Sequence, residues 1–500
     1  MRKGILWILT LMMLFSAAFA ESTQKAPDYL MEGYDGNVDY RVWDTNLFFQ
    51  RMQENTGVSF QFSQHTELEK WEQRKKEIAG GVNLPDVLFK AELSSSEVRD
   101  LYQNGIIIDL APYLETYAPD LWKLLEEHPD WKKAIMMEDG AIPALPAINT
   151  LQTNDAMWIN TAWLKKLKLD IPTTADELTE VLRAFKTGDP NGNYQQDEIP
   201  LGFLGMWELR FLAHAFGIID NDYYVSVKDG TVSSSLTTDE NRAFLKWLHQ
   251  LWEEGLLDQN GFTTTDNLRQ ITDENKAIPY GLLMSSTPLT ILPQKSLSEF
   301  TMLEPLVYNG KQIYCDLGGD LIRGTFAITS ACKEKEPEKL VAWVNNLYTE
   351  AGSRMAYYGL EGDEYQWNED GLWEWNYSLE TVANQILPTN TISEGGTAPC
   401  YVDAEFQSKY LDENTRTIVE AMSELKQHSV IPYPPVTLSA ADEQRIAEIQ
   451  KELSRYAERS MARFVTGDIE LTDENWDTFC RTVTEKGLQE MIGIWQDAIR

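Results

Sequence analysis

Strand-like and helix-like segments alternate in the first quarter of the chain, and this alternation limits the fold more than any other feature. The segments VSFQFS (58–63) and LPDVLFK (84–90) have the length and composition of strands. A helix-like segment at 45–57 precedes the first strand, and a second helix, ending at Gly105, follows the second. Strands that alternate with helices predict a parallel sheet covered by helices, and therefore an α/β fold.

Two helical regions are especially well defined by the sequence. Thr174 and Glu177 form a capping box, and apolar residues follow with helical spacing at Leu178, Val181, Leu182 and Phe185. A long amphipathic helix is expected from Ser439 onward, and at least one more in the range 476–499. The segments 389–400 and 430–437 are rich in turn-forming residues and are predicted to be connectors.

The N-terminus has the three parts of a secretory signal peptide. A basic start at residues 2–3 leads into an apolar run at 5–15 and then a small-residue cleavage site, Ala18-Phe19-Ala20. The apolar run is shorter than the roughly 20 residues that span a bilayer, so an uncleaved anchor is the weaker interpretation. We therefore expect a signal peptide at residues 1–20 and an exported protein. No later segment has the length and apolarity of a transmembrane helix.

Charge and composition exclude several classes of partner. The formal net charge of −35 repels nucleic acid and anionic membrane surfaces. An apolar fraction of 43% argues against general disorder, and 500 residues are enough for two or three domains. The chain is rich in aromatic residues, with 16 Trp and 21 Tyr, which serve either a large core or the stacking of sugar rings.

Common catalytic and metal motifs are missing from the sequence. It contains no GxSxG, no GxxxxGKS and no HExxH motif, and its five histidines are scattered. The cysteines form no CxxC pair; in an oxidising compartment one or two disulfides among them would be compatible with the sequence, which does not show the pairing. They are Cys315, Cys332, Cys400 and Cys480.

One long stretch identifies a family. Residues 156–203, AMWINTAWLKKLKLDIPTTADELTEVLRAFKTGDPNGNYQQDEIPLGF, resemble the core signature of the family 1 extracellular solute-binding proteins of ABC importers. The similarity is greatest to the large, oligosaccharide-binding, lipoprotein-type branch. Further segments agree in order along nearly the whole chain, among them NLPDVLF, DGAIPALPAINT, WEEGLLDQNGFTT, residues 324–365 and the C-terminal helices.

The resemblance implies an α/β protein with the two-lobed periplasmic-binding-protein type II fold, whose ligand lies in a cleft between lobes joined by crossing hinge strands. It implies an N-terminal lobe of residues 21–147 plus 321–366 and a C-terminal lobe of residues 148–320 plus 367–500. We expect a monomer that closes on an oligosaccharide and delivers it to ABC permease subunits in the membrane. Many relatives carry a lipidated Cys directly after the signal peptide. Glu21 stands there in this chain, so we expect a periplasmic or released protein without a lipid anchor.

The polar loop KTGDPNGNYQQDEIPLGF (186–203) is a candidate calcium site. On an EF-hand template, positions 1, 3, 5, 7 and 9 are filled by Asp189, Asn191, Asn193, the Gln195 carbonyl and Asp197. The template is broken by Tyr194 at the glycine position and by Pro200 at the position of the bidentate glutamate. Glu198 takes that last role if the loop resembles the shortened calcium loop of the family. The alternative is an Asx-rich turn without metal. We expect a structural Ca²⁺, distant from the ligand.

The cleft should hold aromatic platforms for sugar rings and polar groups for hydroxyls. The aromatic candidates are Trp43, Trp207, Tyr280, Trp367, Trp373 and Trp375, and the polar ones are Asp44, Glu208, Arg323 and Glu361. Each aromatic residue has core packing as its alternative role. Trp373 and Trp375 would present both rings on one face if their segment is extended.

A secreted carbohydrate-active enzyme, such as a hydrolase or lyase, is the alternative from another functional class. Glycoside hydrolysis needs two carboxylates at a set separation, which sequence alone does not reveal. Because the ordered family segments favour a binding protein, we expect no catalytic residues.

Overall fold

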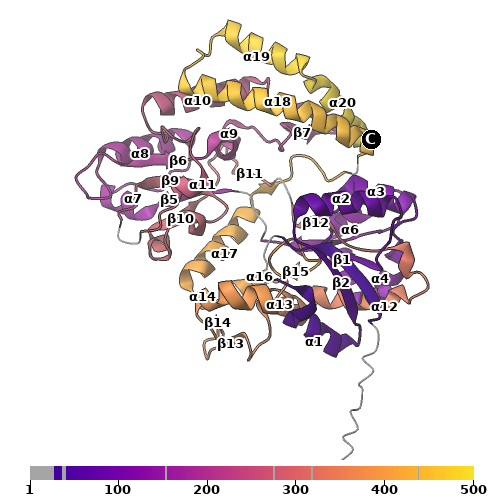
Figure 1. Ribbon diagram of the computed structural model, residues 1–500. Helices are drawn as coiled ribbons and strands as arrows, with labels where there is room; N and C mark the ends of the chain where they lie inside the picture. The colour runs from indigo at the N-terminus through magenta and orange to yellow at the C-terminus, as the bar shows by residue number, and fades with distance from the viewer. Residues whose placement is uncertain are drawn as a thin grey trace, which may run out of the picture.

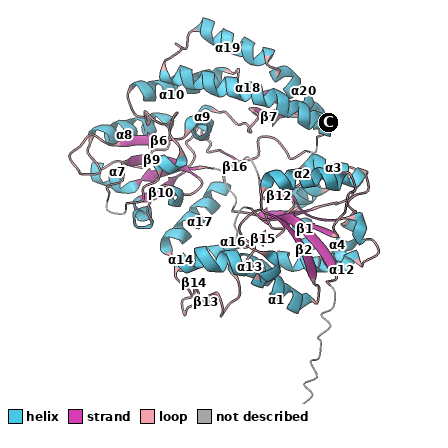
Figure 2. Ribbon diagram, viewed as in Figure 1, coloured by secondary structure: helices cyan, strands magenta, loops and turns pink. Residues whose placement is uncertain are grey.

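The computed structural model describes residues 27–36, 41–151, 155–273, 276–316, 319–436 and 438–499. These residues form two α/β lobes, each built around its own sheet (Figures 1 and 2). The signal peptide predicted at residues 1–20 lies outside the described residues. Within the described part of the chain, no helix has the length and apolarity needed to cross a membrane.

The first lobe contains a six-stranded mixed sheet in the order β15-β4-β12-β3-β1-β2. The strands are β1 Tyr29–Tyr34, β2 Phe60–His65, β3 Val87–Phe89, β4 Leu145–Asn149, β12 Leu321–Ile328 and β15 Tyr401–Val402. The predicted parallel arrangement is confirmed for β1, β2 and β3. It is wrong for β12, which is antiparallel to β3 and β4 because the chain returns from the second lobe and enters the sheet from the opposite end.

Helices cover both faces of this sheet. They are α1 Leu47–Thr56, α2 Leu68–Ala79, α3 Ser95–Gln103, α4 Ala111–Tyr117, α5 Pro119–Glu127, α6 Pro129–Ile135, α12 Pro337–Asn345 and α13 Glu350–Tyr358. The alternation of β3 shows the two layers: Val87 and Phe89 face the core shared with α1 and α12, while Leu88 faces the core shared with α2 and α3.

The second lobe contains a four-stranded sheet in the order β10-β5-β9-β6. Its strands are β5 Ala156–Asn160, β6 Ile199–Gly202, β9 Tyr280–Ser285 and β10 Phe300–Leu303. Its main helices are α7 Thr161–Leu167, α8 Ala175–Thr187, α9 Gly205–Leu209, α10 Asp239–Glu253, α17 Glu413–Lys426, α18 Ala440–Thr466, α19 Asp473–Glu485 and α20 Leu488–Ala498. Figure 1 shows α10 and α18 side by side above this sheet, with α19 and α20 beyond them.

The well-defined sequence signals are confirmed in local detail. Thr174 caps α8 and accepts a hydrogen bond from the Glu177 backbone N–H at 3.2 Å. The second hydrogen bond of the capping box is shifted by one residue: the Glu177 carboxylate accepts from the Thr173 N–H instead of the Thr174 N–H. The long helix predicted from Ser439 is α18, whose first turn is capped by that serine.

The chain crosses between the lobes three times, and the third crossing lies later than the family resemblance implied. The first crossing follows β4 and the second precedes β12, and both lie close to the lobe boundaries expected from the sequence. Residues 367–402, expected in the second lobe, belong to the first: β15 pairs with β4, and Ile392 and Cys400 lie in the first-lobe core. Only α17 returns the chain to the core of the second lobe. The third crossing is therefore the segment between β15 and α17. It is not the earlier hairpin of β13 (Tyr365–Trp367) and β14 (Trp373–Trp375).

The described structure contains no disulfide among the four cysteines, Cys315, Cys332, Cys400 and Cys480, so the bridges considered from the sequence do not form in it. Burial raises the pKa of Cys315 and of Cys332 to about 12. These thiols are therefore protonated at neutral pH and behave as small apolar side chains.

Candidate functional site

In open α/β sheets, ligands bind beyond the carboxyl ends of the parallel strands. In the first lobe, β1 and β3 end at Tyr34 and Phe89, so the next residues, Asp35 and Lys90, lie at this edge. The edge faces the second lobe, because β12 starts there directly after the crossing and the Leu93 N–H donates to its Gly324 carbonyl. In the second lobe the parallel strands are β6 and β9, and β6 leads into α9 and Trp207.

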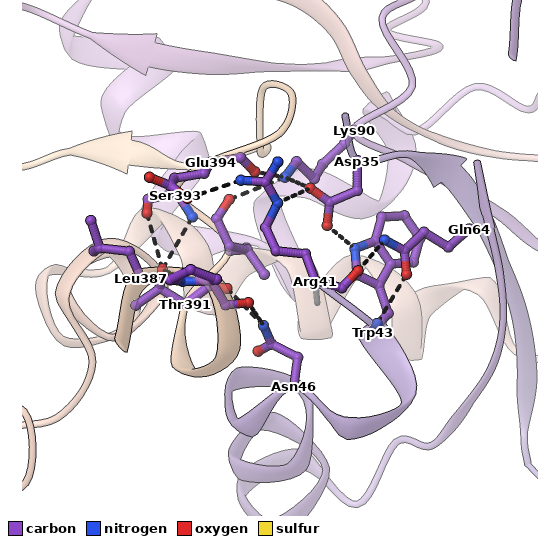
Figure 3. A network of polar contacts seen from close by, with 12 residues as sticks. Asp35, Arg41, Trp43, Asn46, Gln64, Lys90, Leu387, Thr391, Ser393 and Glu394 are labelled. Carbon is purple, nitrogen blue, oxygen red and sulfur yellow. Dashed lines mark hydrogen bonds and ion pairs between the residues drawn. The ribbon is translucent and has the colours of Figure 1, made fainter. Parts of the chain in front are cut away.

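A buried polar network organises the edge of the first lobe (Figure 3). Lys90 is fully buried, and its Nζ donates to Asp35 Oδ1 at 3.0 Å and to the Ile392 carbonyl at 3.3 Å. The Trp43 indole N–H donates to the other oxygen of Asp35. Arg41 Nη1 donates to Glu394 Oε2 at 2.9 Å. The network therefore fixes the loop around residues 392–396 over the ends of β1 and β3.

The charges in this network balance within the lobe. Burial raises the pKa of Asp35 and lowers the pKa of Lys90, and their pairing opposes both shifts. Close packing also requires glycine here: a Cβ on Gly395, which has φ +76°, would lie 2.2 Å from Asp35 Oδ1. Lys90 and Glu92 have φ values of 50° and 53°, left-handed conformations that cost free energy in non-glycine residues and are concentrated at functional sites.

The edge of the second lobe presents one exposed indole. Trp207 in α9 is 41% exposed, which leaves part of its ring free for a ligand. Its neighbour Glu208 is buried and accepts two hydrogen bonds from Arg269, at 2.6 and 2.8 Å. The Leu204 N–H donates to the same carboxylate at 2.7 Å, so Glu208 fixes the start of α9 and thereby the position of Trp207. Burial raises the pKa of Glu208, and Arg269 acts in the opposite direction.

Arg210 continues this edge behind Trp207. Its guanidinium lies 5.8 Å from the centre of the Trp207 ring and 4.5 Å from that of Tyr224. It donates to Asp220 at 3.0 Å, so its charge is neutralised within the lobe. Asp220 is buried, and this ion pair holds the guanidinium in place beside the exposed indole.

The structure separates the residues predicted for the cleft. The prediction that Trp43, Tyr280 and Trp373 face the ligand is wrong. These residues are at most 5% exposed, and their rings are covered by protein. The Trp43 ring packs against Phe49, Phe62 and Phe89, and Trp373 stacks on Phe406 at 4.6 Å. Glu208 is likewise buried in an ion pair rather than free for a sugar.

The predicted aromatic cluster forms a separate feature of the first lobe. The hairpin of β13 (Tyr365–Trp367) and β14 (Trp373–Trp375) places Trp367 directly opposite Trp373. The segment is extended, and the rings of Trp373 and Trp375 lie 5.4 Å apart, as expected for one face. These rings pack on Phe406 and Tyr358 and anchor the hairpin, while Trp367 and Trp375 remain partly exposed.

Three polar candidates remain on accessible positions. Asp44 and Glu361 are exposed, and Arg323 is half-buried near the start of β12, at the edge that faces the second lobe. Sequence reasoning missed Asp35, Arg41, Lys90 and Glu394. Their only local signal is that Asp35 and Lys90 directly follow strands.

The backbone of the polar loop at 189–198 removes one of the two mismatches with the EF-hand template, the one at Tyr194. Tyr194, at the glycine position, adopts φ 61°, the left-handed conformation that the turn requires, and its side chain is 94% exposed. Asn191 and Asn193 both donate to Asp197 Oδ1, at 2.8 and 2.9 Å. Among the described residues, no three His, Cys, Asp or Glu side chains gather as a metal site by themselves. A metal here would therefore depend on amide and backbone oxygens as well.

Glu198 is the unusual member of this loop. Its Oε1 is buried and has no hydrogen-bond partner among the described residues. Burial raises the pKa of Glu198, and the charges of Asp197 and Asp189 raise it further. A buried, unpaired carboxylate oxygen beside two other carboxylates is the environment that a bound cation would stabilise.

Comparison with known proteins gives a consistent picture. The family model described as "Bacterial extracellular solute-binding protein" matches residues 31–354. The fructooligosaccharide ABC transporter substrate-binding protein FusA of Streptococcus pneumoniae is 28% identical over 99% of this chain and 97% of its own. The polygalacturonan/rhamnogalacturonan-binding protein YtcQ of Bacillus subtilis is 22% identical over 84% of this chain and 81% of its own.

Solved structures agree with this relationship. FusA in complex with kestose superimposes with a TM-score of 0.71 and 26% identity, covering 94% of this chain and 98% of that one. An EF-hand mutant of FusA gives 0.70 and 25%, with the same coverage. A solute-binding protein associated with an HMO-binding ABC transporter of Bifidobacterium longum infantis has the same fold, with a TM-score of 0.77, 21% identity and coverage of 94% and 97%. The chain belongs to the bacterial extracellular solute-binding protein family.

Proposed function

We propose that this protein is the substrate-binding component of an ABC importer and that it binds an oligosaccharide between its two lobes. The observation that carries this proposal is the similarity to FusA over almost the entire length of both chains. The geometry supports it, since Trp207 offers an exposed ring at the strand ends of one lobe and the Glu394 side chain, 39% exposed, lies at the strand ends of the other. Aromatic rings stack on sugar rings, and polar groups replace the hydrogen bonds that hydroxyls lose from water.

The charges at the site favour a neutral sugar over a uronic acid. The relatives bind both kinds of ligand: FusA a fructooligosaccharide and YtcQ polygalacturonan. Here three cations near the strand ends are already paired with carboxylates: Lys90 with Asp35, Arg41 with Glu394, and Arg210 with Asp220. Arg323 is the accessible cation named above at this edge. A paired cation attracts a ligand carboxylate weakly, and the protein's charge of −35 repels it.

Calorimetry with a panel of sugars tests this function. The panel contains kestose, a tetrameric fructooligosaccharide, a maltotriose control and trigalacturonate. We expect kestose or the tetramer to bind and trigalacturonate not to bind. Chromatography of the same mixture should recover the ligand intact, since the relatives compared are transporter binding proteins. Cleavage of a sugar would instead support the alternative of a carbohydrate-active enzyme.

We also propose that the loop 189–198 binds a structural Ca²⁺. The support is the left-handed turn at Tyr194 and the unpaired buried oxygen of Glu198. Asp189, Asn191, Asn193, the Gln195 carbonyl, Asp197 and Glu198 would supply hard oxygens, the ligands that Ca²⁺ prefers. A chelator should lower the melting temperature, and Ca²⁺ should restore it, because an ion that binds only the folded state stabilises it. The variant Glu198→Gln should remove this calcium dependence. An unchanged melting temperature in the chelator would contradict the proposal.

The family is extracellular, and we propose that the mature chain begins at Glu21 without a lipid and acts as a monomer that docks on permease subunits. Intact mass of the exported protein and light scattering measure both properties. A mass that includes residues 1–20 or an added lipid would contradict the proposed processing.

A further inference from the structure

The loop around residues 392–396 presents a partly exposed carboxylate at the edge of the first lobe that faces the second. The side chain of Glu394 is 39% exposed, whereas those of Asp35 and Lys90 in the same network are at most 4% exposed. This edge lies at the carboxyl ends of β1 and β3, where open α/β sheets bind their ligands. Glu394 is therefore a member of the network in Figure 3 that an incoming ligand can reach.

One oxygen of this carboxylate is bound by the protein and the other is not. Arg41 Nη1 donates to Glu394 Oε2 at 2.9 Å, and the Arg41 side chain is 11% exposed. The Arg41 Nε lies 3.7 Å from Asp35 Oδ1, so the guanidinium is held between two carboxylates. Among the described residues, none donates a hydrogen bond to Glu394 Oε1. Because each carboxylate oxygen has two lone pairs, Oε1 can accept from a ligand while Oε2 stays with Arg41.

The position of this carboxylate is fixed before any ligand binds. Arg41 holds the side chain, and Lys90 Nζ donates to the Glu394 backbone carbonyl. Further along the loop, the Thr397 N–H donates to Glu92 Oε1 at 3.1 Å. A group that is already held in its binding orientation loses little conformational entropy when a ligand arrives. The loop therefore offers a preorganised hydrogen-bond acceptor.

We propose that Glu394 is a specificity-determining residue of the sugar site: its Oε1 accepts a hydrogen bond from a hydroxyl of the sugar bound between the lobes. This assignment rests on the proposed oligosaccharide function and names a contact for it in the first lobe. An ionised carboxylate only accepts hydrogen bonds, and it repels another negative charge. Glu394 therefore selects sugars that offer a free hydroxyl at this point and rejects those that place a carboxylate there.

Calorimetry on two carboxylate-to-amide variants tests the contact. In Glu394→Gln the amide oxygen must accept from Arg41, which has only donors, so the amide NH₂ group is left for the ligand. This variant should bind kestose, or the panel member that binds best, at least about tenfold more weakly, as expected when a hydrogen bond to a charged group is lost. Glu336→Gln is the matched control, since Glu336 pairs with Lys339 near the start of β1, where the Tyr29 hydroxyl donates to the Glu336 carbonyl. It should bind within about twofold of the wild type, because an exposed ion pair contributes little.

Fluorinated ligands separate a direct contact from a structural role of Glu394. Each monofluoro derivative of the sugar replaces one hydroxyl by fluorine, which cannot donate a hydrogen bond. One derivative should bind the wild type at least about tenfold more weakly than the parent sugar, yet bind Glu394→Gln about as well as the parent does. If Glu394 only holds the loop, every derivative loses the same factor in both proteins, and the assignment is wrong. It is also wrong if Glu394→Gln binds the parent sugar as tightly as the wild type does.

A crystal structure of the wild type with its sugar decides the question even if melting curves show that Glu394→Gln does not fold. A hydroxyl oxygen of the sugar should lie within about 3.0 Å of Glu394 Oε1. A bound sugar with no hydroxyl within that distance overturns the assignment and leaves the proposed function standing. If the wild type binds no member of the panel, the proposed function fails, and the assignment of Glu394 fails with it.

Discussion

Replacing Glu208 with alanine would remove a carboxylate partner from the buried guanidinium of Arg269. The side chains of both residues are at most 4% exposed, and two hydrogen bonds of 2.6 and 2.8 Å join them. Removing one partner of a buried ion pair typically costs about 3–5 kcal/mol. The Leu204 N–H would lose its acceptor as well. For a lobe of this size, each kcal/mol lowers the melting temperature by about 2–4 °C, so Glu208→Ala should melt about 6–20 °C lower than the wild type.

Circular dichroism melting curves measure this shift, and a double variant separates the two roles of the residue. In Glu208→Leu/Arg269→Met both charges are gone and apolar groups of similar size fill the space, so most of the stability should return. If Glu208 acts as a scaffold for α9, the double variant keeps its affinity for the sugar within about threefold. A double variant that is stable but fails to bind would instead show a direct contact with the ligand. The reasoning is refuted if Glu208→Ala melts within about 2 °C of the wild type.

Three further predictions follow from the same contacts. Trp207→Ala should weaken sugar binding by about tenfold in calorimetry, because it removes the exposed ring, whereas Trp122→Ala in the first lobe should bind like the wild type. Lys90→Met should destabilise the first lobe by about 3 kcal/mol in urea unfolding, since Asp35 loses its buried partner, and adding Asp35→Asn should recover part of the loss. The pKa of His214 is lowered to about 4 in the folded protein against about 6.5 when unfolded, so the unfolded state binds the extra proton between these values. Stability should therefore fall by about 3 kcal/mol as the pH drops from 7 to 4, and His214→Leu should remove this part of the pH dependence in urea titrations.

Local signals in the sequence predicted the elements, and long-range contacts determined the site. The helix after Thr174 could be predicted because its cap and its apolar spacing lie within a dozen residues. Lysine is normally a surface residue, and nothing near Lys90 shows that the chain near residue 392 covers it. The same limit explains the error on Trp373. Its neighbours in sequence resemble a loop mouth, whereas Phe406, 33 residues further on, covers its ring.

The mismatch at Tyr194 shows a different limit of sequence reasoning. A template scores the identity of a residue, but the turn requires only a left-handed backbone conformation. Tyr194 provides that conformation at φ 61° because its side chain projects into solvent and meets no neighbour. The departure from the EF-hand template at this position is thus a local energetic cost.

The pairing of charges has a consequence for how the two lobes move. Lys90 with Asp35 and Arg41 with Glu394 are pairs within the first lobe, and Arg210 with Asp220 and Arg269 with Glu208 are pairs within the second. Each of these four pairs lies within one lobe, so separation of the lobes breaks none of them and avoids the cost of leaving a buried charge unpaired. Two hydrogen bonds join the lobes near the start of α18: Ser96 donates to Glu443, and Arg99 donates to the Leu438 carbonyl. Each has one charged partner, and a bond of this kind contributes about 1.5–3 kcal/mol. A ligand that contacts both lobes would add its binding energy to these bonds and shift the balance toward the closed form, as a protein that captures a sugar and later releases it requires.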